Sequence, residues 1–90
     1  VLSPGPQTAD TLGWILTNSG EADTGVLLLR QASAQAANDP RVQYHFAVAL
    51  KDTGNKADAI KLLTAVVAVK ADFAEKARAQ QLLEQLTKGS

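Results

Sequence analysis

The side chains that could do chemistry are few, and their spacing does not match a catalytic or metal site. His45 is the only histidine, whereas a metal site needs several ligands at suitable spacing. Asp52 lies two helical turns further on, and the chain has no cysteine to complete a ligand set. We therefore interpret His45 as a plain polar residue. Ser19, Ser33 and Ser90 lack a placed histidine–acid pair, so nucleophilic catalysis has no support.

Composition and charge exclude further classes of function. The 90 residues allow one small domain, with 46% hydrophobic and 20% charged residues. Nine basic and nine acidic residues balance without a basic patch, so we expect no nucleic-acid partner. The longest apolar runs, 26–29 and 65–69, are too short to span a bilayer, so we expect no membrane insertion of this segment. No pattern predicts a cofactor, a metal ion or an enzyme.

Two glycines mark the elements that must position any binding residues. Gly20 and Gly54 stand 34 residues apart, each between two helical patterns, which is typical of a helix end followed by a new helix. Asp39 and Pro40 have the types expected of an N-cap and a first helical residue. The chain is therefore predicted to be all-α. The five predicted helices cover Pro6–Ser19, Glu21–Ala37, Pro40–Thr53, the segment from the Asn55 cap to Val69, and a last helix that begins near Asp72.

Apolar residues at helical spacing predict one buried stripe on each helix. Asp72 and Glu75 resemble a capping box for the last helix, whose other faces are polar. Gly25 is expected where two helices approach closely. The predicted stripes are Ala9, Leu12, Gly13 and Leu16; Val26, Leu29 and Ala32; Val42, Phe46, Ala47 and Leu50; Ala59, Ile60, Leu63, Val66 and Val67; and Ala79, Leu82, Leu83 and Leu86.

A helix–turn–helix unit with this period resembles the tetratricopeptide repeat. Leu12 and Gly13 take the places of the family's Leu–Gly pair, and Leu16 takes that of its tyrosine. Ala9 and Gln43 stand where the family has tryptophan, so size classes agree better than identities. The resemblance implies a solenoid of two repeats and a C-terminal capping helix. Its expected division is 1–5 as a remnant of an upstream repeat, 6–39 and 40–71 as the two repeats, 72–87 as the capping helix, and 88–90 as a tail.

A narrower resemblance concerns the strings ADTLGWIL and DPRVQYHFAVAL. They are similar to the C-terminal repeats of bacterial tetratricopeptide lipoproteins associated with PEP-CTERM/exosortase sorting. That resemblance implies a fragment of a longer bacterial chain in the periplasm or envelope, whereas the cytoplasm is expected without it. The absence of methionine also favours a chain that is processed or excised.

In the tetratricopeptide family the first helix of each pair lines a concave surface. The resemblance therefore implies a groove that captures a protein or peptide, with Trp14 and Tyr44 as aromatic anchors and with Lys51 and Arg41 facing acidic groups. Trp14 lies off its helical stripe, so it either faces the groove or packs against 40–53 or an upstream helix. The groove residues implied are Asp10, Trp14, Asn18, Arg41, Tyr44, His45, Val48 and Lys51.

A second hypothesis is a structural end-cap that completes a solenoid and binds no ligand of its own. Under either hypothesis we expect an unfilled edge on the first helix. Ile15 and Thr8 should be more exposed than Ala49 and Val42, which stand 34 residues further on. Such an edge predicts modest stability and weak self-association.

Overall fold

Five α-helices follow one another along the chain, and the part that the structure describes contains no strand. The structure is a computed structural model that describes residues 6–70 and 73–88. The helices are α1 (Pro6–Asn18), α2 (Ala22–Gln35), α3 (Pro40–Asp52), α4 (Lys56–Val67) and α5 (Lys76–Lys88). The all-α prediction is confirmed. The predicted upstream remnant, Asp72 of the predicted capping box and the last two residues of the predicted tail lie outside the described residues.

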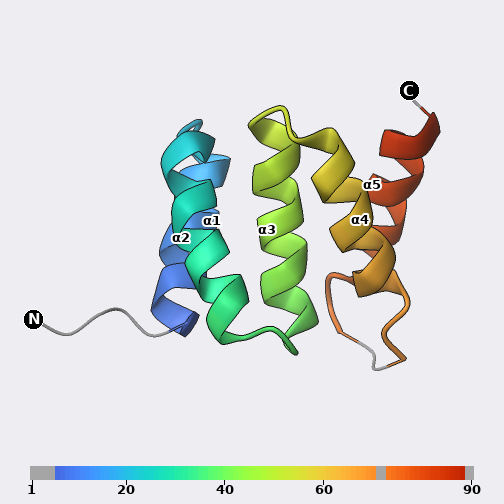
Figure 1. Cartoon of the computed structure of the whole chain (residues 1–90), viewed down its shortest axis with the longest axis horizontal. Helices are drawn as coiled ribbons and strands as arrows, with labels where there is room; N and C mark the ends of the chain where they lie inside the picture. Colours follow the sequence, from blue (N-terminus) through green and yellow to red (C-terminus); the bar gives the residue numbers. More distant parts are fainter. Residues whose placement is uncertain (1–5, 71–72, 89–90) are drawn as a thin grey trace, which may run out of the picture.

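The helices stack side by side in chain order, as Figure 1 shows. Helices α1 and α2 form a first hairpin at one end, α3 and α4 form a second hairpin, and α5 covers α4 at the other end. Helix α2 packs against α3, which joins the two hairpins, and α1 also touches α3 directly. The result is an elongated stack of 44 × 28 × 18 Å. Helix α3 consequently has both helices of the first hairpin as neighbours, together with its own partner α4.

The two hairpins turn in the same way. Gly20 and Gly54 have φ angles of 85° and 87°, a left-handed conformation that costs glycine little. The N–H of the following residue donates back across each glycine, from Glu21 to the Leu16 carbonyl at 2.8 Å and from Asn55 to the Leu50 carbonyl at 2.7 Å. This pattern satisfies carbonyls that a helix end leaves free. The predicted glycine turns are confirmed.

The predicted helix starts agree with the structure at α3 but only in part at α4 and α5. The Asp39 carboxylate accepts a hydrogen bond from the Arg41 N–H at 3.0 Å, and Pro40 occupies the first turn, as expected of an N-cap followed by proline. Asn55 is at the N-cap of α4 but makes no capping hydrogen bond through its side chain. Helix α5 begins at Lys76, later than the predicted start near Asp72. The helix therefore starts after Phe73, whose carbonyl accepts from the Lys76 N–H at 3.1 Å.

The buried hydrophobic side chains form three clusters along the stack. Leu29 of α2 and Leu63 of α4, which stand at equivalent positions of the two hairpins, are fully buried. Val42 of α3 and Val66 of α4 are also buried. The predicted stripe of α1 is wrong at Leu12, which is 47% exposed. Its place on the inner face is taken by residues four apart, Ala9, Gly13 and Thr17, all of them buried.

The first hairpin closes on two glycines. A β-carbon at Gly25 would lie 2.5 Å from the Thr17 Oγ1 and 2.7 Å from the Gly13 carbonyl oxygen. A β-carbon at Gly13 would lie 2.7 Å from the Leu29 Cγ. Helices α1 and α2 therefore approach too closely for any side chain at their crossing. The predicted role of Gly25 is confirmed.

Candidate functional site

Side chains from α1, α3 and α5 line a groove of about 440 Å³, which we call the α1/α3/α5 groove. In each helix most of the lining residues recur three, four or seven positions apart, which places them on one helical face. They are Trp14 and Asn18 from α1, Tyr44, Val48 and Lys51 from α3, and Arg78, Gln81, Leu82 and Gln85 from α5.

An aromatic cluster forms one wall of the groove, where α1 meets α3. The Trp14 indole stacks on the His45 imidazole with ring centroids 4.1 Å apart and planes at 20°. The Tyr44 ring lies 5.9 Å from the Trp14 ring at a tilt of 51°. Such contacts contribute roughly 0.5–1.5 kcal/mol beyond the burial of the rings. Trp14 is half-buried, so it packs against α3 and lines the groove at the same time.

A buried polar pair holds this cluster in place. The Nδ1 of His45 lies 2.7 Å from the Asp10 Oδ1, and His45 is only 7% exposed. The interpretation of His45 as a plain polar groove residue is therefore wrong. A buried polar group needs a partner, and Asp10 supplies it from the neighbouring helix. The pair orients the imidazole beneath Trp14 and does not itself face the groove.

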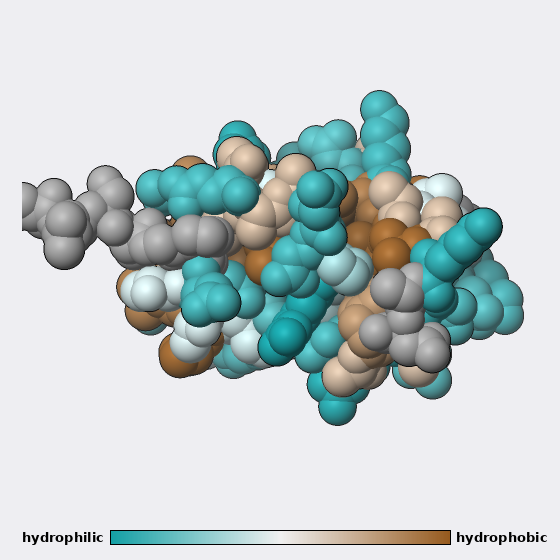
Figure 2. Space-filling view, turned by 90° about the horizontal axis from the view of Figure 1, so that it is seen from below, coloured by the Kyte–Doolittle hydropathy of each residue, from teal (hydrophilic) through white to brown (hydrophobic). Residues whose placement is uncertain are grey.

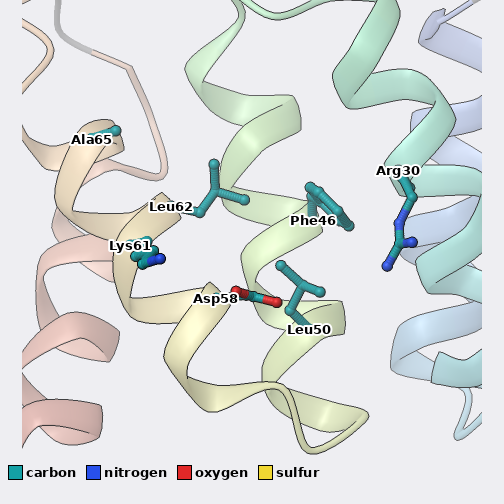
Figure 3. A pocket seen from close by; sticks show the side chains of 7 residues that line it. All are labelled: Arg30, Phe46, Leu50, Asp58, Lys61, Leu62 and Ala65. Atoms are coloured by element: carbon teal, nitrogen blue, oxygen red, sulfur yellow. The ribbon is translucent and has the colours of Figure 1, made fainter.

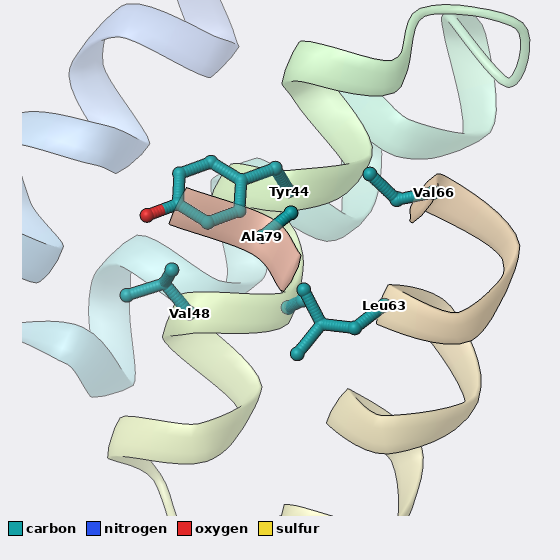
Figure 4. Close-up of a cluster of buried hydrophobic side chains, with 6 residues drawn as sticks. Tyr44, Val48, Leu63, Val66 and Ala79 are labelled. Atoms are coloured by element: carbon teal, nitrogen blue, oxygen red, sulfur yellow. The ribbon is translucent and has the colours of Figure 1, made fainter. Parts of the chain in front are cut away.

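Tyr44 lies between the aromatic cluster and α5. Its ring lies beside Ala79 of α5, and its hydroxyl oxygen points away from Leu63 and Val66 (Figure 4). Burial raises the pKa of the Tyr44 hydroxyl above its ordinary 10.0, the positive charges of Arg78 and Lys51 oppose that rise, and the Glu75 carboxylate adds to it. The hydroxyl is thus the neutral hydrogen-bonding group of a site that charged side chains surround.

The charges around the groove are only partly paired. The Lys51 Nζ is 2.9 Å from the Asp52 Oδ1, whereas Arg78 has no salt bridge among the described residues. Arg78 is exposed. Glu75 has one carboxylate oxygen, Oε2, that is buried without a hydrogen-bond partner in the described part of the chain. The groove therefore offers one free guanidinium group at its α5 wall.

The structure brings together most of the groove residues predicted from sequence. Trp14, Asn18, Tyr44, Val48 and Lys51 line the α1/α3/α5 groove. Asp10 and His45 support it from below, as the buried pair described above. Arg41 is exposed at the first turn of α3 and is not among the lining residues.

The contribution of α5 was missed. Arg78, Gln81 and Gln85 were interpreted as the solvated outer face of a capping helix. Their spacing of three and four residues does place them on one face. That pattern alone does not distinguish a face toward solvent from a face toward a groove, because the distinction depends on where α5 packs.

A second groove of about 580 Å³ lies on the opposite side of α3, between α2 and α4. Phe46 and Leu50 of α3 and Leu62 and Ala65 of α4 form its apolar part, and Asp58 and Lys61 lie at its α4 rim (Figure 3). The Arg30 guanidinium of α2 lies 5.9 Å from the centroid of the Phe46 ring, a cation–π contact. We call it the α2/α4 groove; no sequence pattern had pointed to it.

In the described part of the chain, no group of three or more histidine, cysteine or acidic side chains is arranged to hold a metal ion. Across residues 6–70 and 73–88, every helix is too short or too polar to cross a membrane.

A comparison with protein families identifies the chain. The model of the tetratricopeptide repeat family matches residues 16–86, which is most of the sequence. This chain belongs to the tetratricopeptide repeat family. Searches of curated proteins and of solved structures return no match, so the narrower exosortase-linked resemblance has no support from them. Tetratricopeptide repeats generally mediate protein–protein interactions and are typically non-catalytic, which agrees with the protein partner expected from sequence.

Proposed function

We propose that this tetratricopeptide repeat domain captures a peptide or a protein segment in its α1/α3/α5 groove. The observation that carries the proposal is the convergence of Trp14, Tyr44 and Arg78, one from each of three helices, on a single groove. Aromatic residues and arginine are the side chains that most often dominate binding energy at protein interfaces.

The other lining residues suit a polypeptide ligand. Asn18, Gln81 and Gln85 are exposed amides, and an amide side chain can both donate to and accept from a peptide backbone. Arg78 lacks a salt-bridge partner among the described residues, so it is available for an acidic group of the ligand. In this proposal Arg78 pairs with an acidic group of the ligand, the role that the sequence analysis assigns to Arg41.

A matched pair of arginines tests the proposal. A random-peptide display library is selected on the whole chain, and the affinity of the most enriched peptide is measured by calorimetry. Arg78→Glu should weaken binding by about tenfold or more, the loss expected of a hot-spot residue. Arg30→Glu is the control, because Arg30 is also an exposed arginine but lines the α2/α4 groove. Circular dichroism checks that both variants stay helical.

The result also separates the alternatives. Loss of binding with Arg30→Glu but not with Arg78→Glu would place the ligand in the α2/α4 groove. Failure to enrich any peptide would favour the second hypothesis, in which α5 completes a solenoid and the domain has no ligand of its own.

A further inference from the structure

A second hollow extends the α2/α4 groove along most of α3 and α4. It measures about 250 Å³ and shares Leu62 and Ala65 with the α2/α4 groove. Figure 2, which looks onto the side of the stack where α3 begins and α4 ends, shows apolar surface (brown) to the right of its centre among hydrophilic side chains. We call the two hollows together the extended α2/α4 groove. The other residues that line the second hollow are Ala37, Asn38, Pro40, Gln43, Val66 and Val69.

The lining residues of each helix form one stripe. On α3 they recur three or four residues apart from Pro40 to Leu50, and on α4 they follow the same helical spacing from Asp58 through Ala65 to Val69. At a rise of about 1.5 Å per residue, the stripe of α3 is roughly 15 Å long. The extended groove is therefore as long as about three turns of an α-helix.

The floor of this groove offers a ligand few hydrogen bonds. Phe46 and Leu62 present carbon atoms, and the backbone groups beneath them are bonded within α3 and α4. The Gln43 Nε2 already donates to the carbonyl oxygens of Ser33 and Ala36, at 3.3 and 3.2 Å, and its Oε1 accepts from the Ser33 Oγ at 2.7 Å. An extended peptide would leave its own backbone groups unpaired over this floor, whereas a helix pairs them internally.

The charged lining residues lie at one end of the extended groove only. Arg30 lies on its α2 side, and Asp58 and Lys61 lie on its α4 side (Figure 3). All three are exposed, and none of them forms a salt bridge in the described part of the chain. Two cations and one carboxylate give this end a net positive charge, and the cation–π contact with Phe46 holds the Arg30 guanidinium beside the floor. An acidic ligand group is the complement of such a rim.

We propose that the extended α2/α4 groove binds an amphipathic helix of a partner protein. The apolar stripe of that helix lies on Phe46, Leu62 and Ala65, and acidic side chains on its flanks face Arg30 and Lys61. The partner helix lies on one side of the stack and does not extend it at either end. Because this surface is on the opposite side of α3 from the α1/α3/α5 groove, the proposal does not rest on the proposed function.

A pair of synthetic peptides provides the probe. Each has about 16 residues, enough to form an isolated helix, with leucines three and four residues apart on one face. One peptide carries glutamates on both flanks of that face within a single turn, and the other carries glutamine in their place. Calorimetry measures their affinities for the whole chain. We expect the acidic peptide to bind about tenfold more tightly than the glutamine peptide.

Two neighbouring residues of α4 give a matched test of the floor. Ala65 and Thr64 are both exposed, but only Ala65 lines the groove. Ala65→Glu should weaken the binding of both peptides by about tenfold or more, because it places a carboxylate on the apolar floor. Thr64→Glu adds the same charge and should change either affinity by less than about threefold. Thermal melting followed by circular dichroism shows that each variant folds.

Two arginines separate this groove from the α1/α3/α5 groove. Arg30→Glu should weaken the acidic peptide by about tenfold and the glutamine peptide little, because a reversed rim charge acts on a charged ligand. Arg78→Glu should leave the affinity of the acidic peptide within about threefold, since Arg78 lines the other groove. A loss with Arg78→Glu but not with Arg30→Glu would place the peptide in the α1/α3/α5 groove and overturn the inference.

Three other results would also overturn the inference. The first is that neither peptide binds, or that both bind equally well. The second is a bound peptide whose Cα chemical shifts are those of an extended chain. The third is a concentration-dependent dimer of the natural chain, seen in sedimentation and abolished by Ala65→Glu, which would assign the groove to a second copy. None of these three results bears on the peptide selected from the library, so this inference and the proposed function can fail independently.

Discussion

The two hairpins share their turns but differ in how their helices are covered. In both, a glycine in the left-handed conformation ends the first helix, and the backbone closes the turn with the same hydrogen bond across it. Helix α3, however, is covered on several sides by α1, α2 and α4, whereas α2 and α3 are the main neighbours of α1 in the part of the chain that the structure describes. Equivalent positions therefore differ in burial: Ile15 is 53% exposed, whereas Ala49 is 0% exposed. A local pattern sets the hairpin, and the position in the stack decides which of its faces are buried.

The hairpins also differ in how closely their helices approach. The first crosses at Gly13 and Gly25, and the second has the fully buried Ala47 and Ala59 at the equivalent positions. A β-carbon would clash at the first crossing, whereas the second accommodates a methyl group at each of the two positions.

The largest expected effect tests whether both hairpins have a core of their own. Leu29 and Leu63 are equivalent and fully buried, so Leu29→Ala and Leu63→Ala should each lower the free energy of unfolding by about 2–5 kcal/mol. Leu27→Ala is the control and should cost little, because Leu27 is 65% exposed. Urea denaturation measures all three. A loss confined to Leu63→Ala would mean that the first hairpin is not packed around Leu29.

The next effect concerns the helix crossings. Gly25→Ala should lower the free energy of unfolding by about 2 kcal/mol, because a steric cost of about 3 kcal/mol exceeds the roughly 1 kcal/mol gained in helix propensity. Ala59→Gly at the equivalent position should cost about 1 kcal/mol through lost propensity, more once its lost methyl packing is counted. Thermal unfolding of the two variants gives the comparison. If Gly25→Ala instead raised the melting temperature, the close approach of α1 and α2 would be contradicted.

The smallest expected effect is a pH dependence that arises from Tyr44. Its pKa is raised in the folded chain, chiefly by burial, so folding favours the neutral hydroxyl. That contribution is complete below pH 10.0, the ordinary pKa, and is lost as the pH rises through the higher folded value. Above about pH 10, the free energy of unfolding should fall more steeply with pH in the natural chain than in Tyr44→Phe.

The single tyrosine also allows a direct titration. Tyrosinate absorbance reports Tyr44 alone, and Arg78→Gln should raise its pKa further, because the Arg78 charge lowers it. An unchanged titration curve in that variant would mean that the Arg78 charge does not act on Tyr44, and would contradict the placement of Arg78 beside the α3 wall of the groove.

Sequence patterns predicted the features that depend on neighbours along the chain. The turn glycines, the Asp39 cap and the buried stripes of α2 and α3 follow from spacing and residue type alone. The exposure of Leu12 did not, because it depends on which faces of α1 the helices α2 and α3 cover in the folded stack. The late start of α5 at Lys76 was missed for a related reason, since Phe73 precedes the helix and packs against the second-hairpin core.

For the groove, the sequence predicted the lining residues of α1 and α3 but missed those of α5. Trp14, Tyr44 and Lys51 follow from helix positions that the family uses. Arg78 could be placed only once α5 was seen to pack beside α3, and Arg41, which the sequence favoured, lies elsewhere. The burial of His45 was equally invisible, because its partner Asp10 stands 35 residues away on another helix.

We propose that a peptide binds between α1, α3 and α5, and nuclear magnetic resonance can detect that binding at single residues of the groove. The chain has one tryptophan, so its indole N–H gives a single resonance from Trp14 in the groove wall. On titration with the peptide enriched from the library, that resonance and the side-chain amides of Gln81 and Gln85 should shift most. The claim would be contradicted if these signals stayed in place while the largest shifts fell on the α2/α4 groove, at Phe46 and Lys61.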